Sequence, residues 1–248
     1  MKTPDDWQPR PDCLAGRVVL VTGAGAGIGA AAARTLAAHG ATVVLLDLNV
    51  RSLEAVYDDI EKAGHPQPAI YPMNLEGATE KDYLDLAETL EREFGRLDGL
   101  LHNAAMLGAL VPLAHLETEL WYRVLQVNLN APFLLTRSCL ALLMKSDDAS
   151  ILFCSDAVGR RGRAYWGAYG VSKAGIENLM QTLADEMEAN TSVRVNSFDP
   201  GPVATALRAL AYPGENPASL PQPDEVVRPI LYLLGPDAAG VTGQQFER

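Results

Sequence analysis

Eight residues, Thr22-Gly23-Ala24-Gly25-Ala26-Gly27-Ile28-Gly29, join an apolar run at 18–22 to an alanine-rich helical pattern at 28–39. Glycines let the backbone turn tightly and approach a pyrophosphate, whose charge then rests on the free N–H groups of the helix N-terminus. The spacing Gly23-x3-Gly27-x-Gly29 after a strand therefore predicts a dinucleotide-binding loop. The residues expected to contact the dinucleotide there are Gly23, Gly25, Ala26, Gly27, Ile28 and Gly29.

An acidic residue stands at the end of the next apolar run, at 42–47. Asp47 follows Gly29 by 18 residues, and a carboxylate at that place accepts hydrogen bonds from the adenosine ribose and repels a 2′-phosphate. The first basic residue after it is Arg51. We therefore expect NAD as the cofactor, held in part by Asp47 and Leu48, with NADP disfavoured. The alternative is a glycine-rich turn kept for packing, with Asp47 as a solvated strand end.

Short apolar runs alternate with longer helical patterns along the whole chain. Strands are predicted at 18–22, 42–47, 69–71, 99–102, 151–154, 193–198 and 244–246, and helices at 28–39, 51–63, 80–94, 118–144, 166–189 and 224–234. The strands are nearly all apolar rather than alternating, as in a parallel sheet covered on both faces. The prediction is an α/β, three-layer, doubly wound (Rossmann) fold, with a mostly parallel seven-stranded sheet and helices on both faces.

Composition excludes several classes of protein. The 248 residues hold 48% hydrophobic and 21% charged residues, which fits one globular domain over 1–248. Twenty basic residues against 31 acidic ones, a net charge of −11, argue against a nucleic-acid partner. No apolar run is long enough for a membrane span. A polar start and three separated cysteines, Cys13, Cys139 and Cys154, indicate a cytoplasmic protein.

Two irregular segments flank the predicted core. Residues 1–14 are polar and contain proline, so we expect an N-terminal extension lying loosely on the surface. Residues 206–223 end in a stretch with four prolines, which breaks both helix and strand and is typical of a lid over a substrate. A basic cluster, Arg160, Arg161 and Arg163, is too small for a nucleic-acid footprint and is expected to hold a loop or a small anion.

With later segments added, the chain resembles the short-chain dehydrogenase/reductase family over nearly its whole length. The matching motifs, in order, are the glycine loop, His102-Asn103-Ala104-Ala105, Asn128 within Gln126-Val127-Asn128-Leu129-Asn130, Tyr169-Gly-Val-Ser-Lys173, and Pro200-Gly201-x3-Thr205. Five motifs in order at the family's spacing do not arise by chance. The resemblance implies a nicotinamide-dependent oxidoreductase.

The residues of the fourth motif carry the chemistry. Tyr169 and Lys173 are four positions apart on one predicted helix and share a face. A phenol near pKa 10 is a poor acid–base group at neutral pH, but an adjacent ammonium favours its phenolate form. Tyr169 is therefore the expected proton donor or acceptor. The resemblance further implies that Lys173 holds the nicotinamide ribose and that Asn128 supports a proton-relay water.

The resemblance also implies the remaining cofactor contacts. They come from residues after the third, fourth and sixth predicted strands: Asn74, Leu75, Asn103, Ala104, Ala105, Pro200, Gly201, Val203 and Thr205, besides Tyr169 and Lys173. Asn74 takes the place of an acid that binds the adenine in the family, and Thr205 matches a residue at the nicotinamide carboxamide. Each of these two could instead cap a chain turn.

The family pattern breaks at one catalytic position. The family places a serine 13 residues before the tyrosine, and this chain has Asp156 there. A serine donates a hydrogen bond to the carbonyl oxygen that becomes negative, whereas an ionised carboxylate repels it. Three interpretations are open: Ser155 supplies the hydroxyl, although its side chain should point the other way; Asp156 is protonated and donates; or the site binds cofactor without reduction.

Together these features predict an NAD(H)-dependent oxidoreductase that interconverts a secondary alcohol and a carbonyl on a small organic substrate, impaired or altered by Asp156. The alternative is an NAD-binding protein without turnover, acting as a sensor or interaction partner. Histidine and cysteine spacing predicts no metal site. The resemblance implies a homodimer or homotetramer built on the helices 118–144 and 166–189.

Overall fold

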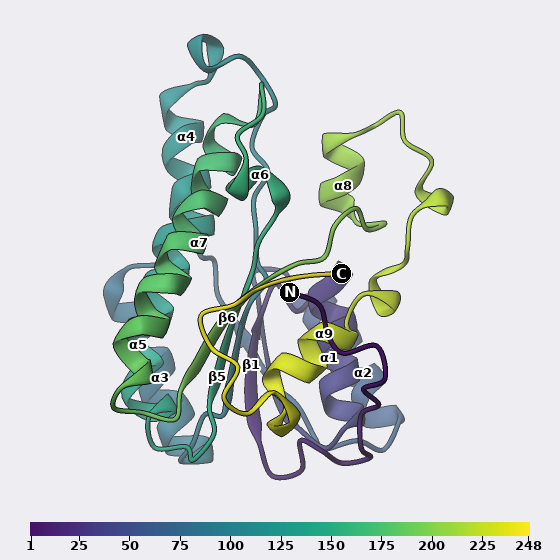
Figure 1. Ribbon diagram of the computed structural model, residues 1–248, viewed down its shortest axis with the longest axis vertical. Helices are drawn as coiled ribbons and strands as arrows, with labels where there is room; N and C mark the ends of the chain where they lie inside the picture. The colour runs from purple at the N-terminus through teal and green to yellow at the C-terminus, as the bar shows by residue number, and fades with distance from the viewer.

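All strands belong to one parallel sheet in the computed structural model, which describes residues 1–248 (Figure 1). The strand order is β3-β2-β1-β4-β5-β6-β7, so strands are added outward on both sides of β1, the first strand of the chain. The strands are β1 (Val18–Thr22), β2 (Thr42–Asp47), β3 (Ala69–Pro72), β4 (Gly99–His102), β5 (Ser150–Cys154), β6 (Arg194–Asp199) and β7 (Gln245–Glu247). The predicted doubly wound fold is confirmed, and every neighbouring pair of strands is parallel.

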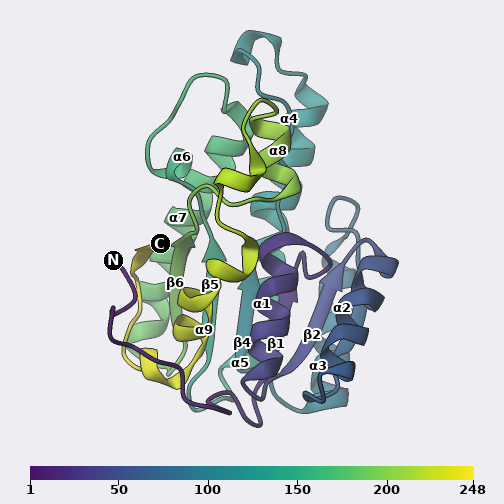
Figure 2. The same ribbon diagram turned by 90° about the vertical axis from the view of Figure 1, so that its right-hand side faces the viewer.

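Helices cover both faces of the sheet, as Figures 1 and 2 show. One face carries α1 (Gly27–Ala38), α2 (Val50–Lys62) and α9 (Arg228–Leu234). The other carries α3 (Glu80–Phe94), α4 (Thr118–Leu125), α5 (Ala131–Leu143) and α7 (Gly167–Glu188). Two short helices, α6 (Ala157–Arg160) and α8 (Ala206–Ala211), lie beyond the carboxyl ends of the strands. No helix is both long and apolar enough to cross a membrane.

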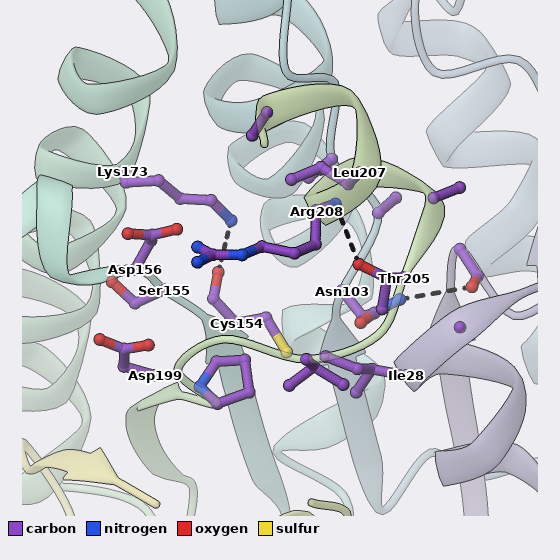
Figure 3. A pocket seen from close by; sticks show the side chains of 18 of the residues that line it. Ile28, Asn103, Cys154, Ser155, Asp156, Lys173, Asp199, Thr205, Leu207 and Arg208 are labelled. Atoms are coloured by element: carbon purple, nitrogen blue, oxygen red, sulfur yellow. Dashed lines mark hydrogen bonds between the residues drawn. The ribbon is translucent and has the colours of Figure 1, made fainter. Parts of the chain in front are cut away.

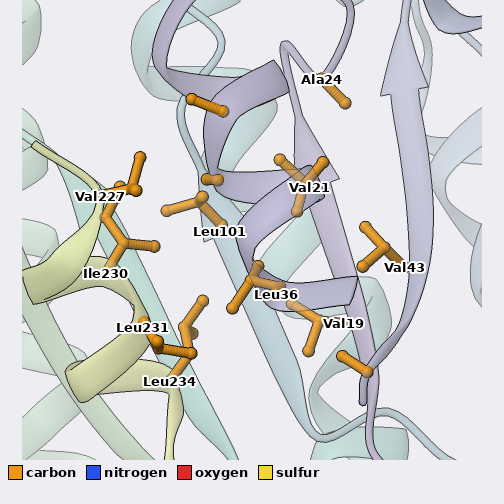
Figure 4. Close-up of a cluster of buried hydrophobic side chains, with 14 of the residues drawn as sticks. Val19, Val21, Ala24, Leu36, Val43, Leu101, Val227, Ile230, Leu231 and Leu234 are labelled. Atoms are coloured by element: carbon orange, nitrogen blue, oxygen red, sulfur yellow. The ribbon is translucent and has the colours of Figure 1, made fainter. Parts of the chain in front are cut away.

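Each face of the sheet has its own buried core. On the α1 side, Val19 and Val21 of β1 pack with Leu36 of α1 and Ile230 of α9 (Figure 4). The first helix contributes small residues, Ala30 to Ala33, all buried, so that its axis lies close to the sheet. The strands are apolar on both sides because both sides are covered.

The helical pattern at 118–144 is one helical run with a distortion in its middle. A π-turn over Gln126–Asn130 separates α4 from α5, and the Ala131 N–H donates to the Gln126 carbonyl. Pro132 explains the distortion, because it has no N–H and its ring would clash with the carbonyl of Asn128 in a regular helix. The extra residue in the turn relieves that clash, and π-turns of this kind often occur at functional sites.

The N-terminal residues are attached more firmly than the sequence suggested. The terminal amine of Met1 donates to the Gln245 carbonyl and Glu247 N–H donates to the Met1 carbonyl, so residue 1 pairs with the edge strand β7. Trp7 packs edge-on against Tyr232 of α9, with ring centroids 5.1 Å apart. The expectation of a loose extension was therefore wrong. Residue 1 covers the exposed edge of β7, and Trp7 covers an apolar surface of α9.

The C-terminal third differs from its prediction in two places. The helix expected at 224–234 begins only at Arg228, after a 3₁₀ turn over Pro223–Glu225, because Pro229 is tolerated only in the first turn of a helix. Within 206–223, the sequence analysis identified no regular element, yet α8 forms at its start. Thr205 caps α8 by accepting a hydrogen bond from the Arg208 N–H at 3.2 Å.

A buried carboxylate ties the amino ends of the central strands together. Asp98, 1% exposed, accepts hydrogen bonds from the Val18 N–H at 2.9 Å, from Ser146 Oγ at 2.6 Å and from Arg96 at 2.6 and 2.8 Å. Burial alone raises the pKa of Asp98, but these hydrogen bonds outweigh burial and bring the pKa below its ordinary value.

We predict that Asp98→Asn lowers the free energy of unfolding at neutral pH by about 2 kcal/mol, because an amide nitrogen then faces hydrogen-bond donors. The folded-state pKa is depressed, so the carboxylate's contribution is present above its unfolded value and is lost as the pH falls through the folded one. The difference between wild type and variant in urea unfolding should therefore begin to shrink as the pH falls below about 4 and disappear below the depressed folded-state pKa. The control Asp85→Asn, whose exposed carboxylate pairs with Lys81, should unfold like wild type. Equal effects of both variants would contradict the role of Asp98.

Candidate functional site

A pocket of about 290 Å³ opens at the carboxyl ends of the central strands (Figure 3). Loops that follow β1, β4, β5 and β6 form its base, and α8 lies over it. The lining residues are Gly23, Ala26, Gly27, Ile28, Asp47, Asn103, Ala104, Ala105, Cys154, Ser155, Asp156, Trp166, Tyr169, Lys173, Asp199, Pro200, Gly201, Val203, Thr205, Ala206, Leu207, Arg208 and Ala211. The segments that the sequence analysis selected are thus brought together.

The glycine loop is held against β4 by side-chain hydrogen bonds. The Asn103 amide donates to the Thr22 and Gly23 carbonyls at 3.1 and 3.3 Å, and Thr22 Oγ1 accepts from the N–H groups of Asn103 and Ala104. A Cβ at Gly29 would lie 2.0 Å from the Gly23 carbonyl oxygen, which no side chain tolerates. Gly23 also has a φ of +67°, which favours glycine. The loop therefore needs these glycines in order to close.

Asp47 lies at the end of β2 beside the glycine loop. Its carboxylate accepts hydrogen bonds from the Gly25 N–H at 3.2 Å and from the Asn49 N–H at 3.0 Å. Leu48, the next residue, is 71% exposed and does not line the pocket. The acid is thus fixed at the rim of the pocket, where the sequence analysis placed it, while the leucine faces solvent.

Tyr169 and Lys173 lie on one face of α7 and both line the pocket. The Tyr169 hydroxyl donates to Asp156 Oδ2 at 3.3 Å, and Lys173 Nζ donates to the Cys154 carbonyl at 2.7 Å. The lysine Nζ lies 5.6 Å from the centroid of the tyrosine ring. The predicted pair is therefore assembled, and Asp156 contacts the tyrosine directly.

Burial and charge act together on this pair. Burial, followed by the Asp156 carboxylate, raises the pKa of the Tyr169 hydroxyl well above its ordinary value. Burial lowers the pKa of Lys173, although the carboxylates of Asp156 and Asp199 oppose that shift. In the free protein the tyrosine is therefore a phenol, the form that donates a proton.

Asn128 does not line the pocket but holds one of its walls. Its side-chain amide donates to the Met106 carbonyl at 2.9 Å and to Ser172 Oγ at 3.0 Å, and its Oδ1 accepts from the Met106 N–H at 2.7 Å. Ser172 lies between Tyr169 and Lys173 on α7. The side chain is thus fully used in joining the segment after β4 to α7.

Ser155 and Asp156 both reach the pocket although they are adjacent in sequence. Asp156 caps α6 by accepting a hydrogen bond from the Val158 N–H at 3.0 Å, with its own backbone still extended. Ser155 is nevertheless among the lining residues, although its side chain was expected to point away. Its hydroxyl is buried and has no hydrogen-bond partner.

Asp199 lines the pocket and was not selected from the sequence. Its carboxylate accepts a hydrogen bond from the Gly201 N–H at 2.8 Å, and burial raises its pKa, with a further contribution from Asp156. An acid that ends a buried strand and precedes the Pro200-Gly201 motif was the available signal. Parallel strands end at one edge of the sheet, so such an acid faces the same site.

The part of the pocket near α8 combines aromatic and charged groups. Trp166 packs between Tyr169 and Tyr212, at centroid distances of 5.6 and 6.0 Å. Arg208 of α8 donates to both Glu215 oxygens, at 2.6 and 2.8 Å, and stacks on the Tyr212 ring at 3.8 Å. The segment 206–223 therefore contains its own ion pair.

Several selected residues lie outside the lining of the pocket. Asn74 Oδ1 accepts a hydrogen bond from the Glu76 N–H at 3.1 Å, and Leu75 is buried in the core, so both form the turn after β3. Gly25 and Gly29 shape the loop without facing the pocket. In the basic cluster, Arg160 pairs with Glu177 at 3.1 Å and with Glu247, so it holds α6 to α7 and β7.

Known proteins share this architecture and sequence. A family model described as short chain dehydrogenase matches residues 17–216. A solved structure from Pseudomonas syringae is 56% identical, has a TM-score of 0.96 and covers 98% of each chain. A structure from Escherichia coli CFT073 complexed with NADPH is 44% identical, has a TM-score of 0.93 and covers 96% of this chain and 99% of that one. The uncharacterized oxidoreductase YciK of Escherichia coli strain K12 is 43% identical over 241 residues, 97% of this chain and 95% of that protein.

The chain belongs to the short-chain dehydrogenase family. It is therefore an oxidoreductase of a family that binds a nicotinamide cofactor and acts on small molecules. The glycine loop fits such a group, because its tight closure brings backbone N–H groups to the pocket where a Cβ would stand in the way.

We predict that Tyr169 ionises well above pH 10, the ordinary value for a tyrosine, because of its burial and the Asp156 carboxylate. Near-ultraviolet titration of wild type and Tyr169→Phe should show the same number of phenolates up to about pH 10. Asp156→Asn removes the charge and should bring one further phenolate to lower pH. The control Asp47→Asn removes a charge at the far rim and should not. A Tyr169 phenolate below pH 10 in wild type would contradict the prediction.

Proposed function

We propose that the protein is an NAD(H)-dependent oxidoreductase that interconverts a secondary alcohol and a carbonyl on a small organic substrate. The convergence of Tyr169 and Lys173 with the glycine loop on one pocket carries this proposal. The tyrosine hydroxyl and the loop belong to distant parts of the chain. A packing role alone would not require both of them to face the same open space.

The residues of the pocket divide into a cofactor part and a reaction part. The glycine loop, Asp47, Asn103 to Ala105 and the segment Pro200 to Thr205 would hold the dinucleotide, whose nicotinamide supplies the hydride acceptor or donor when it is bound. Lys173 and Tyr169 lie deeper, beside Asp156. The segment 206–223 would act as the lid over the substrate.

Tyr169 would transfer the proton. Its raised pKa keeps it protonated in the free protein, so in carbonyl reduction it donates its proton to the oxygen that becomes negative. Lys173 lies near the ring, and its positive charge opposes the effect of Asp156 when the phenolate forms. Proton transfer must then accompany hydride transfer closely, because Asp156 disfavours a free oxyanion.

Ser155 is the one uncommitted hydroxyl beside Tyr169 and Asp156. It lines the same pocket and has no partner, so we propose that it supplies the substrate hydrogen bond that serine provides at position 156 in the family. Asp156 then acts on the tyrosine rather than on the substrate oxygen. This assignment reconciles the presence of Tyr169 and Lys173 with the absence of a serine at position 156.

A second candidate function is cofactor binding without turnover, in which the protein acts as a sensor or an interaction partner. The contact between Tyr169 and Asp156 favours it, because the carboxylate takes the hydroxyl hydrogen bond that a substrate oxygen would use.

We also propose a homodimer or homotetramer in the cytoplasm, built on α4, α5 and α7, where Tyr122, Phe133 and Val171 are exposed.

We predict that Tyr169→Phe lowers kcat/KM for ketone reduction by roughly 10²- to 10⁴-fold, the usual contribution of a positioned proton donor. Asp156→Ser should raise it by about 10-fold, because it replaces a repulsive charge with a donor. NADH oxidation over a panel of ketones measures both effects. The control Asp185→Asn removes an exposed charge on α7 and should match wild type. No turnover by wild type or by Asp156→Ser would favour the binding protein instead.

We predict that wild type binds NADH at least about 10-fold more tightly than NADPH, because Asp47 repels a 2′-phosphate. The double variant Asp47→Ser, Leu48→Arg should reverse this preference, as measured by fluorescence titration. The control Asp58→Asn changes an exposed acid on α2 and should retain it. The NADPH complex of the Escherichia coli relative makes this a demanding test, and tighter NADPH binding by wild type would show that Asp47 does not set the preference.

A further inference from the structure

Two carboxylates of the pocket share one lining lysine, Lys173, and neither of them forms an ion pair with it. Asp156 and Asp199 follow the adjacent strands β5 and β6, whose register pairs Cys154 with Phe198. Neither acid forms an ion pair, and Asp199 is only 8% exposed. A poorly solvated carboxylate without a cation is costly, so a positively charged ligand would be stabilised between them.

The cations nearest these acids are committed to other partners. Lys173 donates to the Cys154 carbonyl at 2.7 Å, and Arg160 pairs with Glu177 and Glu247. On the lid, Arg208 is held by Glu215 through two hydrogen bonds. Lys173 is thus the lining cation that no carboxylate holds, so two carboxylates face a single positive charge, and an added cation is favoured over an added anion.

An uncommitted hydroxyl lies with the two acids. Ser155 precedes Asp156 and stands opposite Asp199 across the two strands, since its N–H donates to the Phe198 carbonyl at 2.8 Å. It is 5% exposed, lines the pocket, and its Oγ has no hydrogen-bond partner. Figure 3 shows the three side chains along one side of the pocket. A buried hydroxyl without a partner is rare in a folded protein and indicates a place that a ligand atom occupies.

Part of the pocket lining is apolar. Trp166 and Leu207 line it, together with Ala211, and Tyr212 packs on Trp166 at 6.0 Å. The tyrosine hydroxyl of Tyr169 lies beside the acids. A molecule that fits both sides has an apolar group, a reacting carbon near Tyr169 and a positive charge close to that carbon.

We propose, on the basis of the proposed oxidoreductase function, that Asp156, Asp199 and Ser155 bind a substrate ammonium group, and that the substrates are secondary alcohols or ketones with a protonated amine on the neighbouring carbon. The carboxylates accept hydrogen bonds from the ammonium, and the apolar wall holds the rest of the molecule. Asp156, which disfavours an oxyanion, becomes favourable when a cation lies beside it.

The reaction leaves the amine unchanged. In oxidation, Tyr169 first releases its own proton to solvent; the carbinol C–H bond then breaks and its hydride goes to NAD⁺, while the hydroxyl proton passes to the Tyr169 phenolate. The products are an α-amino ketone, NADH and one proton. The ammonium contributes only to binding and orientation.

The test compares three alcohols with one carbon skeleton and different charges: 2-amino-1-phenylethanol, 1-phenyl-1,2-ethanediol and mandelate. With NAD⁺ and wild type, kcat/KM should be at least about 10-fold higher for the amine than for the diol, and lowest for the anion. Asp199→Asn retains an oxygen for the Gly201 N–H, and the ratio of its kcat/KM for the amine to its kcat/KM for the diol should fall by about 10-fold. The control Asp185→Asn should preserve the preference.

A binding measurement separates this proposal from the proposed function. Calorimetry on the NADH complex should show tighter binding of 2-phenylethylamine than of 2-phenylethanol in wild type, and equal binding in Asp199→Asn. Turnover of the diol without a preference for the amine would overturn the ammonium site and leave the oxidoreductase intact. Preferential amine binding without turnover of any alcohol would support the site and overturn the enzyme. A change in NAD⁺ affinity on Asp199→Asn that equals the change for the amine would show that Asp199 faces the cofactor instead.

Discussion

The burial of a parallel sheet on both faces is the constraint on which the rest of this structure depends. Apolar side chains fill both sides of β1, β4 and β5, so polar groups are confined to the strand ends. At the carboxyl edge, the loops from distant segments meet and the glycine loop closes against Asn103. The same constraint brings Ser155 and Asp199 together, because adjacent parallel strands end side by side. The pocket is thus a consequence of how the sheet is covered.

Charge distinguishes this pocket from a generic member of its family. A serine at position 156 would be neutral and would donate to a substrate oxygen, whereas Asp156 accepts the hydroxyl of Tyr169 and raises its pKa. Asp199 adds a second carboxylate, and Lys173 is the one lining cation that no carboxylate holds. A site with this balance of charge disfavours an isolated oxyanion and favours a positive group. The replacement of serine by aspartate at position 156 is therefore easier to explain when Asp199 is considered with it.

Local rigidity supports the reaction part of the site through contacts that do not face the pocket. Asn128 joins the segment at Met106 to Ser172 on α7, and the π-turn around it exists because Pro132 cannot continue a regular helix. Arg160 holds α6 to α7 and to the last strand through Glu177 and Glu247. The short helix capped by Asp156 is thereby held in place from behind.

Sequence alone was sufficient for the alternating elements, the glycine loop, Asp47 and the Tyr169–Lys173 pair, because periodicity and short spacings within one element are local properties of a chain. The π-turn at Asn128 left the apolar pattern of 118–144 unchanged, so no periodicity could reveal it. Asp199, the free hydroxyl of Ser155 and the Arg208–Glu215 pair became visible only in the tertiary structure. Their roles depend on which strands are neighbours and which charges already have partners, and those relations exist only between segments that folding brings into contact.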